Sequence, residues 1–224
     1  MASTVFSLDT PQGPGRLFLD LADRQRSILV LGHGASGGVE SADLELLARG
    51  LPDLGTSVLR FEQPWRTAGR KVAASAPRLD EAWVVALDWL SGQEWARQPL
   101  VVGGRSAGAR VACRTAAKTD AAAIVCLAFP LHPPGRPEKS RVSELLTPTV
   151  PRLILQGSKD SFGTADQIRA AIGNTPGTIV VELPAADHSL RIGKSSVFTP
   201  ADLRMTLVTE VSRFIAAVVG ITTP

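Results

Sequence analysis

One short segment of the chain has the residue types and the spacing that turn a serine into a nucleophile. It is Gly104-Arg105-Ser106-Ala107-Gly108, and it lies between the apolar run 100–102 and the alanine-rich stretch 107–118. In a G-x-S-x-G turn the serine occupies a strained connection from strand to helix that exposes its hydroxyl. The flanking glycines are needed because strand and helix pass too close there for a Cβ atom. The pattern predicts Ser106 as a nucleophile, but it also arises by chance, so other loops must support it.

A serine hydroxyl becomes reactive when a base accepts its proton and a third group orients that base. On a parallel sheet an acid and then a histidine follow such a serine, each after a later strand. Of the three histidines, His188 fits this order. His33 precedes Ser106, so we expect it in the first crossover loop beside the substrate. His132 precedes the candidate acid, and we expect it to border the pocket and contact the substrate.

The best candidate for the acid is Asp160. It follows the predicted strand 152–155, where a loop at the carboxyl end of the sheet is expected. Asp166 falls in the next predicted helix, and Asp187 adjoins His188 in sequence. A solvated helix residue and a loop-stabilising residue are the favoured interpretations of these two carboxylates. The sequence therefore predicts Ser106, His188 and Asp160 as one catalytic set.

Acyl transfer also requires hydrogen-bond donors for the oxyanion of the tetrahedral intermediate. In this arrangement they are backbone amides of the residue after the nucleophile and of an early glycine-rich loop. Ala107 supplies the first, and the loop 31–38 supplies the second through Ala35, with Gly34 as the alternative. A phosphate-binding loop is the competing interpretation of 31–38, but the segment lacks the Gly-Lys-Ser/Thr ending and the dinucleotide fingerprint.

The composition is that of an ordinary globular protein. The chain has 224 residues, of which 44% are hydrophobic and 20% charged, and we expect one domain spanning 1–224. The net charge of +3 comes from scattered basic residues, which gives no support to nucleic-acid binding. Cys113 and Cys126 are expected to be small buried side chains in a reducing cytoplasm. We identify no signal peptide, membrane span, metal site or organic cofactor.

Short aliphatic runs alternate with segments of helical periodicity, which is typical of a parallel sheet covered on both faces. Turn residues 10–15 between apolar runs predict an antiparallel hairpin ahead of it. A helix is predicted from Thr199-Pro200-Ala201-Asp202 onward, because these residues cap and start helices. No insertion is long enough for a lid domain. The predicted strands are 4–8, 17–21, 28–31, 57–61, 100–103, 123–127, 152–155 and 178–183.

These motifs resemble the dienelactone-hydrolase-like branch of the α/β-hydrolase superfamily. Within it they are most similar to the group of testis-expressed protein 30 and regulatory subunit 3 of the NSL histone acetyltransferase complex. The proline-rich stretch is the most specific part, and the chain departs from the group at Ala107 to Ala109 and at Ser161. The segments that carry the resemblance are 32–35, 60–64, 103–106, 129–137, 156–157 with Asp160, 162–163 and 187–188.

The resemblance implies an α/β-hydrolase fold and a serine hydrolase that cleaves a carboxylic ester or thioester of a small molecule. Ser106, Asp160 and His188 map onto the catalytic positions of the superfamily. Arginines at or near the same loops are solvated side chains or recognise an anionic substrate group; they are Arg60, Arg66, Arg105 and Arg136. The alternative is a non-catalytic interaction module that binds a partner through the loop 130–137, because this fold does not by itself guarantee catalysis.

Overall fold

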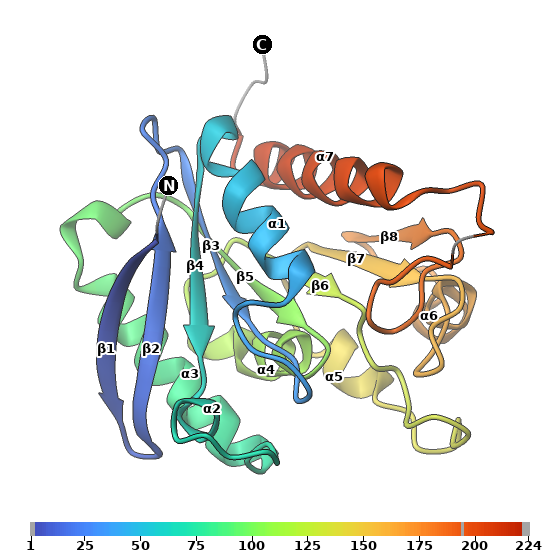
Figure 1. The fold of residues 1–224 in the computed structure, drawn as a ribbon, viewed down its shortest axis with the longest axis horizontal. Coiled ribbons are helices and arrows are strands. Elements are labelled where there is room, and N and C mark those ends of the chain that lie inside the picture. The colour runs from blue at the N-terminus through green and yellow to red at the C-terminus, as the bar shows by residue number, and fades with distance from the viewer. Residues whose placement is uncertain (1–2, 194, 221–224) are drawn as a thin grey trace.

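A twisted sheet of eight strands forms the centre of the structure, a computed structural model that describes residues 3–193 and 195–220 (Figure 1). The strand order is β1-β2-β4-β3-β5-β6-β7-β8. Neighbours from β4 to β8 run parallel, whereas β2 pairs antiparallel with both β1 and β4. The strands are β1 (Thr4–Thr10), β2 (Gly13–Asp20), β3 (Ser27–Gly32), β4 (Thr56–Glu62), β5 (Leu100–Arg105), β6 (Ala123–Leu127), β7 (Arg152–Gly157) and β8 (Thr178–Leu183).

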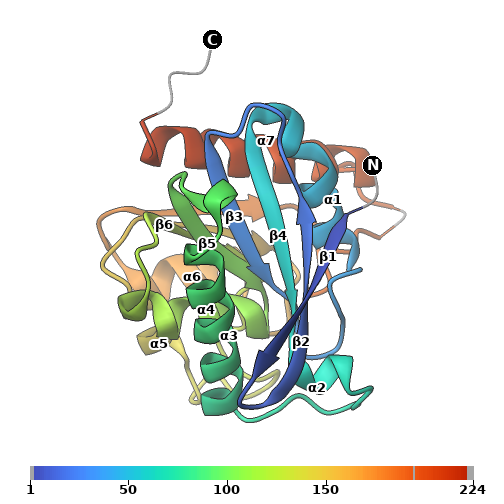
Figure 2. The ribbon, with the colours of Figure 1, turned by 90° about the vertical axis from the view of Figure 1, so that its left-hand side faces the viewer.

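Helices cover both faces of the sheet (Figure 2). One face carries α1 and α7, which pack against each other, and the other carries α3, α4 and α5 in sequence. The helices are α1 (Ala42–Gly50), α2 (Pro64–Thr67), α3 (Ala76–Ser91), α4 (Ala107–Thr115), α5 (Val142–Leu146), α6 (Ala165–Ile172) and α7 (Pro200–Val218). Short 3-10 turns lie at Pro52–Leu54, Glu94–Ala96 and Ala116–Lys118.

The sheet separates two apolar cores because successive strand residues point to opposite faces. In β3, Ile28 and Val30 pack in the core beneath α3 and α4, while Leu29 and Leu31 pack in the core beneath α1 and α7. All four side chains are fully buried. A strand buried on both faces is a continuous apolar run, which is why these strands were recognisable in the sequence.

The predicted architecture is confirmed, with one local difference in the hairpin. The predicted turn 10–15 is shorter in the structure, where Thr10 already pairs with Gly13 and only two residues form the turn. Pro14 is therefore part of β2, in register with Asp9. A proline is tolerated there because the pairing of β2 with β4 begins only at Arg16. The missing N–H of Pro14 therefore removes no hydrogen bond between β2 and β4.

The final helix begins where the sequence predicted. Thr199 accepts a hydrogen bond from the Asp202 amide (3.2 Å), and the Asp202 carboxylate accepts one from the Thr199 amide (2.9 Å). This reciprocal capping box fixes the start of α7. In the described part of the chain, no helix is long and apolar enough to cross a membrane. The ends of the predicted domain, residues 1–2 and 221–224, lie outside the described residues.

Candidate active site

Ser106 is the single residue between strand β5 and helix α4. Its backbone has φ 51° and ψ −107°, a positive φ that a residue with a Cβ atom seldom adopts. The Ser106 amide donates to the Leu127 carbonyl of β6 (2.9 Å), and its carbonyl accepts from the Arg110 amide in α4 (3.2 Å). The surrounding strand and helix therefore hold the strained turn that the sequence predicted.

The two glycines of the turn allow β3, β5 and α4 to approach closely. A Cβ atom at Gly104 would collide with the Gly32 carbonyl oxygen and with the backbone of Gly108. A Cβ atom at Gly108 would collide with the same carbonyl. The clashing atoms are backbone, so no side-chain rotation could relieve them. This confirms the predicted reason for glycine on either side of the serine.

The structure brings the three predicted catalytic residues together from three separate loops. The hydroxyl of Ser106 lies 2.9 Å from Nε2 of His188. Nδ1 of His188 lies 2.8 Å and 3.0 Å from the two carboxylate oxygens of Asp160. A carboxylate accepts hydrogen bonds, so Nδ1 carries the proton and Nε2 is free to accept the serine proton. These contacts join residues 82 and 28 positions apart in sequence.

Asp160 lies almost fully buried, and its charge is balanced by hydrogen bonds. Besides His188 it accepts from the side-chain amide of Gln156 (2.9 Å) and from the backbone N–H of Phe162 (2.7 Å). Gln156 is itself fixed by the carbonyls of Phe129 (3.2 Å) and Gly163 (2.6 Å). These hydrogen bonds satisfy the buried carboxylate and hold it in one orientation towards His188.

The imidazole of His188 is also held by packing. The ring of Phe162 stacks on it, with ring centres 4.0 Å apart and an angle of 28° between the planes. The turn that carries His188 is closed by Asp187, whose carboxylate accepts from the amides of Ser189 (2.8 Å) and Arg191 (2.9 Å). Asp187 thus stabilises the loop, as expected. Asp166 lies on α6, where it pairs with Arg169.

Ala107 and Ala35, the predicted oxyanion donors, line one small pocket. Ala107 is the first residue of α4, so its N–H has no partner within the helix. Ala35 follows β3 in the glycine-rich loop, and its N–H donates to none of the described residues. Gly34, the alternative donor, lines the same pocket. The loop therefore offers free amides beside the serine.

His33 is buried, and the protein itself uses both of its ring nitrogens. Nδ1 donates to the Gly34 carbonyl (2.8 Å), and Nε2 accepts from the Gln63 amide (3.1 Å). Burial lowers the pKa of His33 below its usual 6.5, because the charged form loses its hydration. His33 is thus a neutral side chain that shapes the glycine-rich loop. Its ring lines the pocket, so a substrate can meet only the ring and not a free nitrogen.

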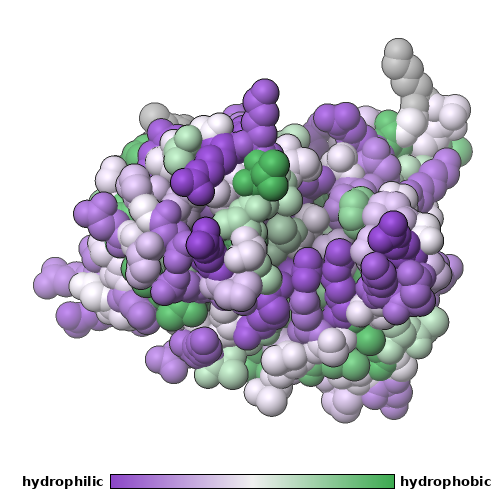
Figure 3. All heavy atoms as spheres, turned by 90° about the horizontal axis from the view of Figure 1, so that it is seen from below, coloured by the Kyte–Doolittle hydropathy of each residue, from purple (hydrophilic) through white to green (hydrophobic). Residues whose placement is uncertain are grey.

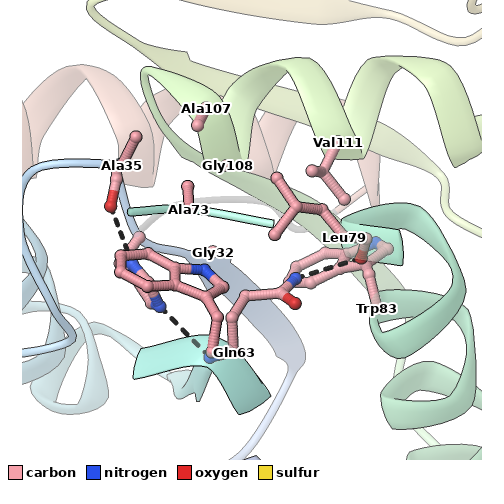
Figure 4. Close-up of a pocket in the computed structure, with 12 residues that line it drawn as sticks. Gly32, Ala35, Gln63, Ala73, Leu79, Trp83, Ala107, Gly108 and Val111 are labelled. Atoms are coloured by element: carbon pink, nitrogen blue, oxygen red, sulfur yellow. Dashed lines mark hydrogen bonds between the residues drawn. The ribbon is translucent and has the colours of Figure 1, made fainter. Parts of the chain in front are cut away.

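The pocket beside Ala107 and Ala35 is narrow and mainly apolar (Figure 4). It has a volume of about 10 Å³, which accommodates roughly one water-sized group. Leu79 of α3 and Val111 of α4 form one side of the pocket. The side-chain amide of Gln63 donates a hydrogen bond to the Leu79 carbonyl (3.1 Å). The other side chains of the wall are those of Trp65, Ala73 and Trp83.

Arg105, predicted to contact the substrate, forms contacts with the histidine loop and with helix α1. Its guanidinium donates to the backbone carbonyl of His188 (2.8 Å) and pairs with the Asp43 carboxylate of α1 (3.2 Å). The side chains of Arg105 and Asp43 are only 7% and 6% exposed. Burial raises the pKa of Asp43, and the charge of Arg105 opposes this shift. Arg105 therefore links the serine turn to the histidine loop.

His132 belongs to the proline-rich loop 130–137, and its side chain is buried. Its Nδ1 donates to the Pro133 carbonyl (3.0 Å), and its backbone amide donates to the Phe162 carbonyl (3.0 Å). Its Nε2 has no hydrogen-bond partner among the described residues. The structure places His132 beside the loop of Asp160, and contact with a substrate stays a prediction.

Sequence reasoning assigned no role to Gln156, Phe162 or Asp43. Gln156 and Phe162 flank Asp160 at four residues before and two after, so proximity in sequence was a usable signal. Asp43 gave no comparable signal, because an acid in the first turn of a helix is ordinary. Only the fold shows that it faces Arg105.

No lid domain covers this end of the sheet. In the described part of the chain, the segment between β6 and β7 contains only the five-residue helix α5, and no helix precedes α7 after β8. Figure 3 shows the lower face of Figure 1, where a hollow with weakly hydrophobic residues is flanked by hydrophilic side chains. The prediction of a fold without a lid is confirmed.

The fold and the site define an α/β hydrolase of the lidless type. The family model for the alpha/beta hydrolase domain matches residues 25–216, and the chain belongs to this family. A lidless serine hydrolase from Xanthomonas campestris, XC6422, is similar, with a TM-score of 0.73 and 22% identity over 96% of this chain and 95% of that one.

Two further solved structures share the fold. Est1E from Butyrivibrio proteoclasticus has a TM-score of 0.75 and 14% identity, over 96% of this chain and 100% of that one. Dienelactone hydrolase from Anabaena variabilis has a TM-score of 0.71 and 18% identity, over 97% and 99% of the two chains. At these identities the likeness concerns the fold, and function must be argued from the site.

Proposed function

We propose that this chain is a serine hydrolase that cleaves a carboxylic ester or thioester through an acyl-enzyme intermediate. The observation that carries the proposal is the continuous set of hydrogen bonds from Ser106 through His188 to Asp160. A non-catalytic interaction module has no need for this alignment. The buried acid and the strained serine turn also support a reactive site, because both are maintained against a cost in stability.

In the first half-reaction, the Ser106 hydroxyl oxygen attacks the carbonyl carbon while Nε2 of His188 accepts its proton. Asp160 stabilises the imidazolium and keeps the ring in place. The amides of Ala107 and Ala35 donate to the oxyanion of the tetrahedral intermediate. When the intermediate collapses, the bond to the leaving oxygen or sulfur breaks, and His188 gives this atom the proton.

In the second half-reaction, water replaces the leaving group. His188 removes a proton from the water, whose oxygen attacks the acyl carbon of the ester at Ser106. The new tetrahedral intermediate collapses, the bond to the serine oxygen breaks, and His188 returns the proton to that oxygen. The products are the carboxylic acid and the free enzyme, so no electron donor or acceptor is required.

The narrow pocket supports a short acyl group. It borders Ala35 and Ala107, beside which the acyl carbon must lie, and its volume is about 10 Å³. A pocket of this size takes a methyl group, whereas a longer acyl chain would have to displace Leu79 or Val111. We infer that acetyl esters and thioesters react faster than those of longer acids.

The test is labelling of purified protein with a fluorophosphonate, together with hydrolysis of p-nitrophenyl acetate. The wild type should form a covalent adduct and release p-nitrophenol, and Ser106→Ala should do neither. Ser143→Ala is the matched control, because it removes an exposed hydroxyl on α5 that lies outside the proposed site. A wild type that neither labels nor cleaves any short ester would instead support the interaction module with its loop 130–137.

The proposal also covers the substrate class, the subgroup within the family and the cellular location of the chain. One structural neighbour, Est1E, has been solved with ferulic acid bound, and another is a dienelactone hydrolase. Both are consistent with hydrolysis of a small ester. Membership of the group of testis-expressed protein 30 rests on the sequence motifs alone. We propose one domain in a reducing cytoplasm, which the free, buried thiols of Cys113 and Cys126 support.

A further inference from the structure

A second, larger hollow lies next to the proposed active site. It is a groove of about 620 Å³ between α1, α7 and the loop after β8. Its wall includes Arg105, Ser189 and Ser36, and these residues are the direct neighbours of Ser106, His188 and Ala35. The groove therefore adjoins the loops of Ser106, His188 and Ala35.

The direction of the groove distinguishes the two halves of an ester. His188 must protonate the leaving atom, so the leaving group lies on the side of the histidine loop. The groove is lined by Ser189 to Ile192 of this loop, whereas Ala107 lines the narrow pocket and not the groove. The narrow pocket thus faces the acyl group, and the groove faces the alcohol or thiol that leaves.

The floor of the groove is apolar. Leu203 and Leu207 lie one turn apart on α7, and Leu46 of α1 is half-buried opposite them. The histidine loop adds Leu190 and Ile192. Leu190, Leu203 and Leu207 are buried, whereas Leu46 and Ile192 are half-buried. An alkyl chain placed on Leu46 and Ile192 removes apolar area from water on both sides, which favours its binding.

The charged residues of the groove leave an excess of positive charge. Arg105 is balanced by Asp43 at its inner end. Arg191 and Arg204 are exposed at the rim, and neither side chain forms an ion pair or hydrogen bond with another described residue. Among the described residues of the wall Asp43 is the only acid, so the rim attracts anions.

We propose that this groove binds the leaving group of the substrate, an alcohol or thiol whose apolar chain ends in a carboxylate or phosphate. The inference rests on the proposed hydrolase function. The chain of the leaving group packs on Leu46 and Ile192, above the buried Leu203 and Leu207, and its anionic end meets Arg191 and Arg204. On acylation, the bond from the acyl carbon to this group breaks and the proton from Ser106 leaves with it through His188.

The experiment compares three acetate esters of equal chain length. Their alcohols are ω-hydroxyhexanoate, hexanol and ω-aminohexanol, which carry a negative, no and a positive charge. The wild type should show the highest kcat/KM for the anionic ester and the lowest for the cationic one. The double variant Arg191→Gln/Arg204→Gln should lower the ratio of anionic to neutral kcat/KM about tenfold, since each exposed charge contact contributes modestly.

Two controls separate the groove from other effects. Arg213→Gln removes an exposed positive charge from the same helix outside the groove, and it should leave the anionic-to-neutral ratio unchanged. Raising the salt concentration should reduce the preference of the wild type, because exposed charges are screened. Free ω-hydroxyhexanoate should inhibit the wild type competitively.

The proposal is wrong if the wild type does not distinguish the three esters, or if the double variant keeps the full preference. It is also wrong if Arg213→Gln has the same effect as the double variant, or if ω-hydroxyhexanoate inhibits without competing. Cleavage of hexyl acetate that depends on Ser106 would meanwhile uphold the proposed hydrolase function. Failure of the groove and failure of the enzyme are thus separate results.

Discussion

Replacing Arg105 by methionine should reduce both the stability and the turnover of this protein. Methionine has a similar length but cannot pair with Asp43 or donate to the His188 carbonyl. The carboxylate of Asp43, only 6% exposed, would then be buried without a counterion. Breaking a buried pair in this way costs about 3–5 kcal/mol. At about 2–4 °C per kcal/mol for a chain of 224 residues, the Tm should fall by about 6–20 °C.

The unpaired carboxylate of Asp43 determines how the loss of stability depends on pH. Burial already raises the pKa of Asp43, and the loss of Arg105 removes the charge that lowers it. The native variant then binds the Asp43 proton more tightly than the unfolded chain does, so its stability rises as the pH falls through the pKa of the folded state. Urea unfolding followed by circular dichroism at neutral and acidic pH measures this change.

The double variant Arg105→Met/Asp43→Asn should regain most of the lost stability, because no buried charge is left unpaired. It should not regain turnover, since the His188 carbonyl still lacks its donor and the imidazole is less well positioned. We expect a lower kcat for p-nitrophenyl acetate in both variants. A single variant as stable as the wild type, or a double variant as unstable as the single one, would refute the reasoning.

Three other changes test the site and its support. Asp160→Asn should lower kcat about 10⁴-fold. It should also lower the Tm by a few degrees, because the new amide nitrogen would face the hydrogen-bond donors that surround the carboxylate. Full activity in the ester assay would assign the acid role to another residue. His33→Gln should reduce the acid sensitivity of unfolding. The lowered pKa of His33 contributes stability above pH 6.5, and this stability is lost as the pH falls below that value. Identical curves of unfolding free energy against pH for the two proteins would contradict this. Gly108→Ala should lower the free energy of unfolding in urea by about 2–3 kcal/mol, because the new Cβ atom clashes with the Gly32 carbonyl. Gly193→Ala, with open space around the new Cβ atom, should lower it little. Equal effects of the two substitutions would contradict the close approach of the backbone at Gly108.

The sequence was sufficient for the sheet and for the serine turn. The central strands β3 to β7 are buried on both faces and therefore appear as largely apolar runs, so their positions could be predicted within a few residues. The hairpin turn was placed too broadly, because the tolerance of Pro14 in β2 depends on where its pairing with β4 begins. Local sequence does not contain that register.

The candidate site was partly predictable for a related reason. The fold places a serine, an acid and a histidine in this order along the chain, and the candidates Ser106, Asp160 and His188 follow β5, β7 and β8. Contacts between distant loops had no such order to reveal them. Nothing in the sequence indicated that the Arg105 guanidinium pairs with Asp43 and donates to the His188 carbonyl, whereas its contact with a substrate stays a prediction.

By itself, the sequence determined which residues can react and how the chain presents Ser106, because apolar periodicity and backbone sterics act over short distances. Only the tertiary structure decided the tautomer of His33, the neighbours of Asp160 and the groove between α1 and α7. These features depend on distances between side chains far apart in the chain, which are set by how the helices pack on the sheet.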